Sequence, residues 1–246
     1  MRSDTLQVKI NSNWLFVVAV MFCVIMGFIY PNIQSSASSA YSRVTGIEYL
    51  VDADNQYSAN MLMQKETQTW QSDPQGLQSF GMSAAPYWFK FTLPQVDTQR
   101  NWLLQVGYPL LDHISVWFED NGKILAEYHS GDTLPFAQRP IENERFLFPV
   151  PQAEQLITVY IRVQTTGALR LSVDVWPESS YLSFASEYNL VMGLFLGFML
   201  AMAISNLFYF VTTKISTFAV YAGYVVFLAL SLASLHGFGY KHIWPE

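Results

Sequence analysis

The sequence predicts an exported all-β domain, a jelly roll or β-sandwich, followed by an α-helical transmembrane hairpin. Three observations lead to this prediction. The N-terminal segment has the basic, apolar and small-residue order of a secretory signal. The middle of the chain is a succession of short alternating segments bounded by turn residues. Two long apolar runs near the other end carry no acidic or basic side chain and are long enough to cross a bilayer.

The N-terminal segment, residues 1–40, is expected to direct export. Arg2 and Lys9 precede the apolar run Trp14–Tyr30, and the small polar tract Gln34–Ala40 follows it. The run is slightly long for a signal peptide and slightly short for a membrane span, so the segment is either a cleaved signal peptide or an uncleaved anchor. In both cases the basic end stays inside and the chain after it is placed outside the cytoplasm.

Residues 41–187 form the expected exported domain, and this domain is acidic. It contains nine Lys and Arg against seventeen Asp and Glu, a net charge of −8. An acidic domain gains no counterion-release energy from nucleic acid, so DNA or RNA binding is not expected. The single cysteine, Cys23, lies in the N-terminal apolar run, which excludes a disulfide framework and a cysteine metal site.

Short β-branched and aromatic segments separated by turn residues predict the strands of this domain. The pair Asn121-Gly122 between two of them is typical of a tight hairpin turn, because both residues tolerate positive φ angles. The least regular part is Ala59–Gly76, where we expect a short helix or a loop. The expected strands are Ile47–Val51, Trp88–Leu93, Trp102–Val106, His113–Glu119, Lys123–Tyr128, Arg145–Pro149, Gln155–Gln164 and Leu169–Trp176.

Two apolar runs then predict a membrane hairpin. The first, Leu190–Val211, would span about 33 Å as a helix, against roughly 30 Å for the hydrocarbon core of a bilayer. The second, Phe218–Leu235, follows after a connection of only six residues, so the two helices must be antiparallel neighbours. Export of the preceding domain places Lys214, between the two runs, on the cytoplasmic side.

Motifs of specific order and spacing run from residue 47 to residue 246. They are Tyr87–Leu93, Trp102–Leu104, Gly107–Asp112, Gly131-Asp132, Pro135-Phe136, Gln138–Pro140, Tyr160–Gln164, Ala201–Phe210 and Gly237–Pro245. In this order they resemble the N-terminal part of the bacterial seven-transmembrane receptors with diverse intracellular signalling modules, the 7TMR-DISM family. The matching part is the exported sensory domain and the first transmembrane hairpin.

This resemblance implies an exported jelly roll of carbohydrate-binding type, seven membrane helices and a cytoplasmic output domain such as a diguanylate cyclase or histidine kinase. Residues 188–246 correspond to the first two helices of that bundle. We therefore expect the chain to be the front end of a longer receptor, because a bundle cut after one hairpin would leave its interior faces unpaired in lipid. The implied location is the bacterial inner membrane, with residues 41–187 in the periplasm.

The sequence contains none of the common catalytic motifs. It lacks the GxSxG nucleophile elbow, the HExxH zinc helix, the GxxxxGK[ST] phosphate loop and the Rossmann GxGxxG. The four histidines lack metal-ligand spacing, and neighbouring strand residues such as Asp112 and His113 point to opposite faces. We expect no enzyme activity, cofactor or metal from these residues, and the output enzyme of a longer parent protein stays open.

We expect the exported domain to bind a small polar or carbohydrate-like ligand. Exposed aromatic side chains stack on sugar rings while nearby polar groups bind the hydroxyls, although large aromatics in strands more often form core. Trp88 lies on the strand face opposite to Tyr87 and Phe89, so one of the two sets must be buried. The candidate ligand-binding residues are Trp88, Tyr108, Asp112, Asp132, Gln138 and Arg139.

Two interpretations of Arg139 are open. In the structural one, Arg139 forms an ion pair with Asp112 or Glu142, and Asp132 caps the turn at Gly131. In the functional one, the planar guanidinium of Arg139 binds a carboxylate or a pair of hydroxyl groups on the ligand.

Four residues of the first membrane helix are expected to pack against other helices. Gly193 and Gly197 form a close-packing face. Ser205 and Asn206 are polar and costly in hydrocarbon unless they are paired, so we expect them to face other helices. A hydrogen bond of Asn206 that rearranges between receptor states is the alternative to a purely structural bond.

These expectations describe a membrane-bound sensory receptor whose exported domain binds a ligand and shifts the packing of the membrane helices. Its expected partners are the lipid bilayer, the ligand, the remaining helices and a cytoplasmic signalling domain, and a homodimer stays open. The alternative is a membrane-tethered protein-interaction module without a small-molecule ligand. An exposed flat apolar patch with a free strand edge would favour this alternative.

Overall fold

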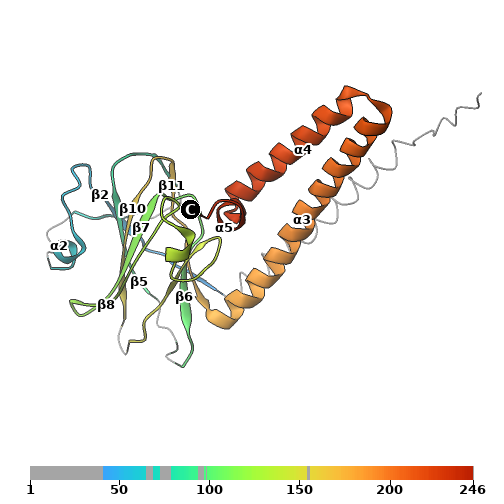
Figure 1. Cartoon of the computed structure of the whole chain (residues 1–246). Helices are drawn as coiled ribbons and strands as arrows, with labels where there is room; N and C mark the ends of the chain where they lie inside the picture. The colour runs from blue at the N-terminus through green and yellow to red at the C-terminus, as the bar shows by residue number, and fades with distance from the viewer. Residues whose placement is uncertain are drawn as a thin grey trace, which may run out of the picture.

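The computed structural model describes residues 41–64, 69–72, 79–93, 97, 99–153 and 156–245. The expected export signal, residues 1–40, lies outside the described residues. Within them, a β-sandwich comes first and a pair of long helices follows (Figure 1).

Two antiparallel sheets form the sandwich, and their order mixes strands that are distant in sequence. One sheet has the order β1 (Ser42–Arg43), β12 (Val173–Pro177), β6 (Trp102–Val106) and β9 (Phe146–Pro149). The other has the order β3 (Gln71–Ser72), β2 (Glu48–Val51), β5 (Tyr87–Thr92), β10 (Thr158–Gln164), β7 (His113–Asp120) and β8 (Lys123–Ser130). A separate ribbon pairs β4 (Ser79–Met82) with β11 (Ala168–Arg170).

Alternation along the strands explains how the core forms. Phe89 and Phe91 of β5 and Ile161 of β10 point between the sheets, where they are buried with residues of both layers. Their neighbours along each strand point to the outer face, as the period of two requires. The core is therefore a single apolar layer between two sheets, which is the sandwich arrangement.

Most of the predicted strands are confirmed, and the corrections are local. Asn121 and Gly122 adopt φ angles of 51° and 79° in the β7–β8 turn, as predicted for a tight hairpin. The expected strand Leu169–Trp176 is in fact two strands, β11 and β12, which pair with different partners. The prediction missed β1, β3 and β4, each of four residues or fewer. The irregular segment contains a short helix, α2 (Ala59–Gln64).

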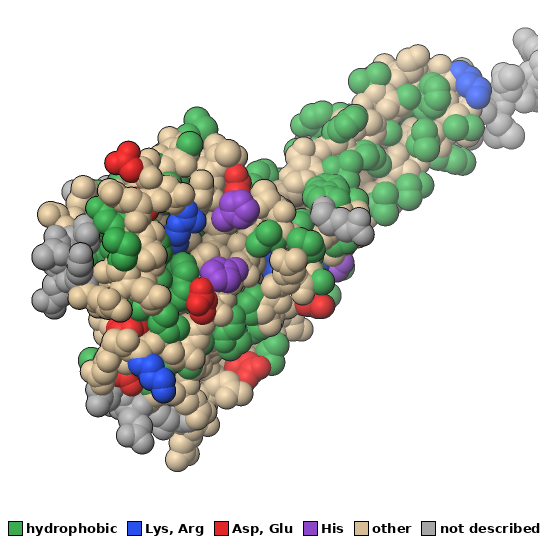
Figure 2. All heavy atoms as spheres, turned by 60° about the vertical axis from the view of Figure 1, so that its left-hand side comes forward, with side chains coloured by type: hydrophobic (Ala, Val, Ile, Leu, Met, Phe, Trp, Pro, Cys, Tyr) green, Lys and Arg blue, Asp and Glu red, His purple; other side chains and the backbone are tan. Residues whose placement is uncertain are grey.

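Two helices are long and apolar enough by length and composition to cross a membrane, α3 (Glu178–Thr213) and α4 (Ser216–Leu235). They pack against each other as an antiparallel pair (Figure 1), and apolar side chains cover the outer surface of the pair (Figure 2). Met199, Ala203 and Val225 form the buried contact between them. The short helix α5 (Phe238–His242) follows α4.

The passage from the sandwich into α3 is direct. Strand β12 ends at Pro177 and α3 begins at Glu178, twelve residues before the predicted membrane run. The first turns of α3 pack on the outer face of the four-stranded sheet, where Tyr181 and Ala185 are buried against Leu103 and Trp176. Strand β12 and α3 are thus joined without an intervening linker, and the start of α3 forms part of the packing of the sandwich.

Candidate functional site

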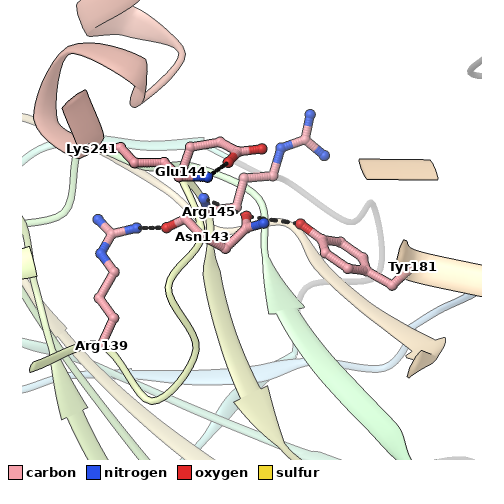
Figure 3. Close-up of polar contacts among 6 residues, drawn as sticks. All are labelled: Arg139, Asn143, Glu144, Arg145, Tyr181 and Lys241. Atoms are coloured by element: carbon pink, nitrogen blue, oxygen red, sulfur yellow. Dashed lines mark hydrogen bonds and ion pairs between the residues drawn. The ribbon is translucent and has the colours of Figure 1, made fainter. Parts of the chain in front are cut away.

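One loop of the sandwich contacts both the start of α3 and the short helix α5 that follows α4. This loop, residues 131–145, connects β8 to β9 and is called the junction loop below. Its residues bond to α3 on one side and to α5 on the other (Figure 3). We therefore take the junction loop, the start of α3 and α5 as the candidate functional site.

The contact with α3 depends on Asn143. The buried hydroxyl of Tyr181 donates a hydrogen bond to Asn143 Oδ1 at 2.9 Å, and the backbone N–H of Arg145 donates to the same oxygen at 2.9 Å. The guanidinium of Arg145 lies over the rings of Phe184 and Tyr188 of α3, at 5.4 and 4.8 Å. A polar bond and two cation–π contacts thus hold the loop on the first turns of α3.

The contact with α5 is an ion pair together with close backbone packing. Lys241 Nζ lies 3.3 Å from a carboxylate oxygen of Glu144, whose side chain is buried. Gly237 precedes α5 with a φ angle of 80°, and a Cβ atom there would lie 2.5 Å from the carbonyl oxygen of Glu144. The N–H of Phe136 donates to the carbonyl of Pro245 at 2.9 Å. Only glycine permits this approach of two backbones with this conformation.

Arg139 lies inside the junction loop in an aromatic cage. Its side chain is only 6% exposed, and the guanidinium lies over Phe136, Phe146 and Tyr240 at 5.0, 4.4 and 5.1 Å. Burial lowers the pKa of Arg139 to about 10, although Tyr240, Asp132 and Glu144 favour its charged form. Nη1 donates to the carbonyl of Asn143 at 2.6 Å. The cage therefore ties the junction loop to α5 through Tyr240, whose hydroxyl also donates to the carbonyl of Leu134.

Buried polar atoms without a hydrogen-bond partner concentrate at this site. In the described part of the chain they are Gln105 Oε1, Arg139 Nε, Arg139 Nη2, Trp176 Nε1 and Asn189 Oδ1. Arg139 belongs to the junction loop, Asn189 to α3, and Gln105 and Trp176 to the sheet face that α3 covers. A buried polar atom without a partner costs about 1–3 kcal/mol. In the described residues, the buried polar atoms near the junction are thus less completely hydrogen-bonded than those of the sandwich core.

The predicted ligand-binding residues fall into two separate places. Asp112, Asp132, Gln138 and Arg139 lie on the junction loop or the loop beside it, and Thr133 Oγ1 donates to the carbonyl of Asp112 at 2.7 Å. Trp88 lies instead on the outer face of the six-stranded sheet. The ligand-binding role of each residue stays a prediction.

The two carboxylates of this set have pKa values shifted in opposite directions. Burial tends to raise the pKa of Asp112, but hydrogen bonds from Thr166 and Thr165 lower it below its usual range. Burial raises the pKa of Asp132, and the negative charge of Asp112 adds to this effect. Asp112 is thus fixed by neighbouring threonines, whereas Asp132 is held in surroundings that disfavour its charge.

Two expectations about individual side chains are corrected. Arg139 forms an ion pair with neither Asp112 nor Glu142 among the described residues, because the aromatic cage encloses its guanidinium. Trp88 is only 1% exposed, so both faces of β5 are covered rather than one. The cover is α2 and Trp117, on which Trp88 stacks at 5.3 Å. Tyr108 is half-buried, with Arg170 5.9 Å above its ring, and Gln138 is exposed.

The packing of the membrane residues against other helices stays a prediction. Ser205 Oγ donates to the carbonyl of Ala201 and Asn206 Nδ2 to that of Met202, both at 2.8 Å, so each side chain makes one hydrogen bond within its own helix. No heavy atom of the described residues lies within 4 Å of a Cβ placed on Gly193 or Gly197. Packing of this glycine face against a further helix stays a prediction.

Sequence reasoning missed the junction as a site. Asn143, Glu144 and Tyr181 carry no recognisable motif, and their partners lie tens of residues away along the chain. The one available signal was the largely polar stretch Gln138–Arg145 directly before the apolar strand β9. This stretch indicates a surface loop with a functional role, but it does not indicate which element the loop contacts.

A β-sandwich that continues directly into α3, and whose junction loop also contacts the short helix α5 that follows α4, is consistent with a membrane receptor that has an extracellular domain. Residues 45–177 match the family 7TMR-DISM extracellular 2, and residues 188–246 match the family 7TM diverse intracellular signalling. The chain belongs to the 7TMR-DISM family of membrane sensory receptors. The residues matched are the extracellular part and the membrane part of this family.

Comparison with other proteins adds little beyond the family. No curated protein matches the chain. Two similar solved structures are the β-glucuronidase of Ruminococcus gnavus and the same enzyme in complex with uronic deoxynojirimycin, each at 12% sequence identity and a TM-score of 0.37. Each similarity covers 56% of this chain and 29% of the solved chain. The chain thus spans less than a third of the length of these enzymes.

Proposed function

We propose that this receptor binds a small carbohydrate-like ligand with its exported sandwich and passes the resulting change through the junction loop to the membrane helices. The helices would act on a cytoplasmic output domain of diguanylate cyclase or histidine kinase type. The proposed location is the bacterial inner membrane, with the sandwich in the periplasm.

The single observation that carries this proposal is the double attachment of the junction loop. Asn143 bonds to α3 while Glu144, the next residue, pairs with Lys241 beyond α4. A shift of this loop would therefore change the contacts of α3 and of α5, the helix that follows α4, at once. A ligand can drive such a shift only if its affinity differs between the two packings.

The alternative, a protein-interaction module, finds less support at the strand edges. Among the described strands, β8 forms one edge of the six-stranded sheet. Its pairing with β7 contains an irregularity near Phe118, and it exposes Lys123 and Glu127. Irregular register and exposed charges are devices that oppose strand addition by a partner.

Hydrogen exchange on the full chain in lipid nanodiscs tests the proposal. The chain would be tested with glucose, galactose, N-acetylglucosamine, maltose, glucuronate and galacturonate. A sugar that raises the melting temperature is expected to change the exchange rates of amides in residues 131–145 and in α5. Binding of a sugar with no change in these amides would contradict the relay, and absence of binding by every sugar would contradict the ligand class.

A variant separates transmission from binding. Asn143→Ala removes the bond to Tyr181 and is expected to keep sugar binding while the exchange response of the first turns of α3 is lost. Gln99→Ala, at an exposed position distant in sequence from the junction, is the matched control and should keep both.

A further inference from the structure

The outer face of the six-stranded sheet carries a group of side chains that the junction does not use. Along β5 and β10 the register places Arg162 opposite Trp88 and Tyr160 opposite Lys90. Ile161, between the two β10 residues, is buried in the core, so its neighbours point to the outer face. Figure 2 shows this side of the molecule, where histidine and basic side chains lie among apolar ones.

Aromatic rings form the floor of this face. Trp88 stacks on Trp117 at 5.3 Å, and the Trp70 ring lies 6.3 Å from that of Tyr160. Helix α2 covers part of the floor through Leu62, whereas Trp70 remains partly exposed at its margin. A partly exposed indole beside polar groups is a suitable surface for the apolar face of a ring-shaped ligand.

Within the described part of the chain, the two cations of this face form no ion pair with a carboxylate. None of the ion pairs among the described residues includes Arg162 or Lys90, and both side chains are half-buried. Arg162 Nη2 donates to two amide oxygens, Asn55 Oδ1 at 2.7 Å and Gln164 Oε1 at 3.0 Å. Lys90 Nζ lies about equally far from Trp70 and Tyr160, at 5.9 and 6.0 Å from the ring centres.

Nearby acidic residues do not neutralise these cations by direct contact. Asp52 acts on Arg162 through space, but its carboxylate accepts hydrogen bonds from the N–H groups of Gln56 and Tyr57 and from Trp88 Nε1. Glu48 lies opposite Lys90 on β2 without forming an ion pair within 4.0 Å. Among the described residues, Arg162 thus bonds only to neutral amide oxygens and Lys90 contacts only aromatic rings. This is a local exception in a domain of net charge −8, from nine basic and seventeen acidic residues.

We propose that Arg162 and Lys90 bind the carboxylate of an acidic sugar, a uronic acid, whose ring lies beside Trp70. Lys90 and Arg162 are diagonal neighbours across β5 and β10, at about 7–8 Å or less between Cβ atoms, so two long side chains can reach one carboxylate. The planar fork of an arginine matches the two oxygens of a carboxylate.

Hydroxyl groups of the same ligand would meet polar side chains on the neighbouring strands. Ser115 of β7 lies opposite both Arg162 of β10 and His129 of β8, and Ser115 Oγ is 2.8 Å from His129 Nδ1. This inference rests on the proposed function, because it names the chemical class of the ligand and the face that binds it.

Titration calorimetry on the full chain in nanodiscs tests the inference. Galacturonate and glucuronate are the probes, and galactose and glucose are the uncharged controls. We expect saturable binding of at least one acid, at least tenfold tighter than its uncharged counterpart and weakened by added salt. Arg162→Gln and Lys90→Gln should each weaken acid binding at least tenfold, whereas Arg100→Gln, at an exposed arginine paired with Asp97, should leave it unchanged.

Three results would overturn the inference in distinguishable ways. Binding of neutral sugars without binding of either acid would reject the acidic ligand and leave the proposed function standing. Equal binding of an acid by the wild type and by a folded Lys90→Gln protein would reject this face, even if Arg162→Gln failed to fold. Absence of binding by acids and neutral sugars alike would reject both the inference and the proposed ligand class.

Discussion

The core of the sandwich and its junction with the membrane helices are built by opposite means. In the core, apolar side chains such as Phe118 and Leu104 are fully buried, and the buried polar atoms without a partner lie elsewhere, at the surfaces that meet the hairpin. At the junction, a caged arginine, an ion pair and one tyrosine hydroxyl make the contacts. The difference teaches that the sandwich is a rigid body, whereas the junction can change its packing at low cost.

The largest effect is expected from the core. Phe118→Ala should lower the free energy of unfolding by about 3–5 kcal/mol, because a fully buried ring leaves a cavity. Thermal unfolding of the full chain in detergent, followed by tryptophan fluorescence, measures this loss. Leu156→Ala, at a side chain 58% exposed, is the control and should change stability by less than about 0.5 kcal/mol. Similar losses for both variants would refute the rigid core.

The next effect concerns the glycine that lets α5 approach the junction loop. Gly237→Ala should cost roughly 2–3 kcal/mol, since the new Cβ meets the Glu144 carbonyl and the positive φ angle is strained. Gly46→Ala has a φ angle of 70° but open space around the Cβ, so it should cost only about 1–2 kcal/mol. Equal losses in thermal unfolding would mean that close approach at Gly237 does not matter.

A smaller loss is expected from the bond between the junction loop and α3. Tyr181→Phe removes the hydroxyl that donates to Asn143 Oδ1 and should cost about 1 kcal/mol. The half-buried Tyr108 provides the control, since Tyr108→Phe should be nearly neutral. An unchanged unfolding temperature in Tyr181→Phe would show that this bond contributes nothing.

Removal of the charge of Arg139 from its aromatic cage should raise the free energy of unfolding, whereas the preceding substitutions lower it. Arg139→Met keeps an unbranched side chain in the aromatic cage and removes two buried nitrogen atoms without hydrogen-bond partners. Because a buried polar atom without a partner costs about 1–3 kcal/mol, their removal should outweigh the lost bond to the Asn143 carbonyl, and we expect a gain of about 1 kcal/mol. Arg139→Lys keeps the charge without the planar stacking and should not gain. A loss above 3 kcal/mol in Arg139→Met would show that the charge holds the junction together.

The smallest effect is a pH dependence of opposite sign at two neighbouring carboxylates. The pKa of Asp132 is raised, so its contribution to stability is present below the unfolded pKa and lost as pH rises through the folded pKa. The pKa of Asp112 is lowered, so its contribution is present above the unfolded pKa and lost as pH falls. Melting temperatures measured between pH 3 and pH 7, a range chosen around the usual carboxyl pKa of about 4, should show Asp132→Asn more stable and Asp112→Asn less stable than wild type at neutral pH. The same sign for both would contradict the assignment.

The sandwich was largely predictable because the alternation of apolar and polar residues along a strand shows which of its side chains are buried. Alternation identified β5, β7 and β10, and Asn121-Gly122 identified the hairpin turn between β7 and β8, since both signals depend on near neighbours. The early start of α3 was not predictable from hydropathy, because residues 178–189 are too polar for a membrane span and are buried on one side only.

The junction could not be predicted for a related reason. Tyr240 meets the junction loop at Leu134 across a sequence separation of 106 residues, and no local pattern records such a contact. Neither interpretation of Arg139, an ion pair or a ligand contact, included the aromatic cage, because the rings of Phe146 and Tyr240 come from other elements. The buried Trp88 was misjudged because its cover, α2, comes from a segment without a clear period.

Hydrogen exchange of the full chain without ligand tests the central claim, that the junction can repack while the sandwich stays rigid. The amides to compare are Phe136, Arg139 and Ile243, which bond across or within the junction, and Val159 and Ile161 of the central strand β10. We predict that the junction amides exchange at least a hundredfold faster, through local opening that leaves β10 intact. Equal protection of the two groups would contradict the claim and would show that sandwich and hairpin move as one body.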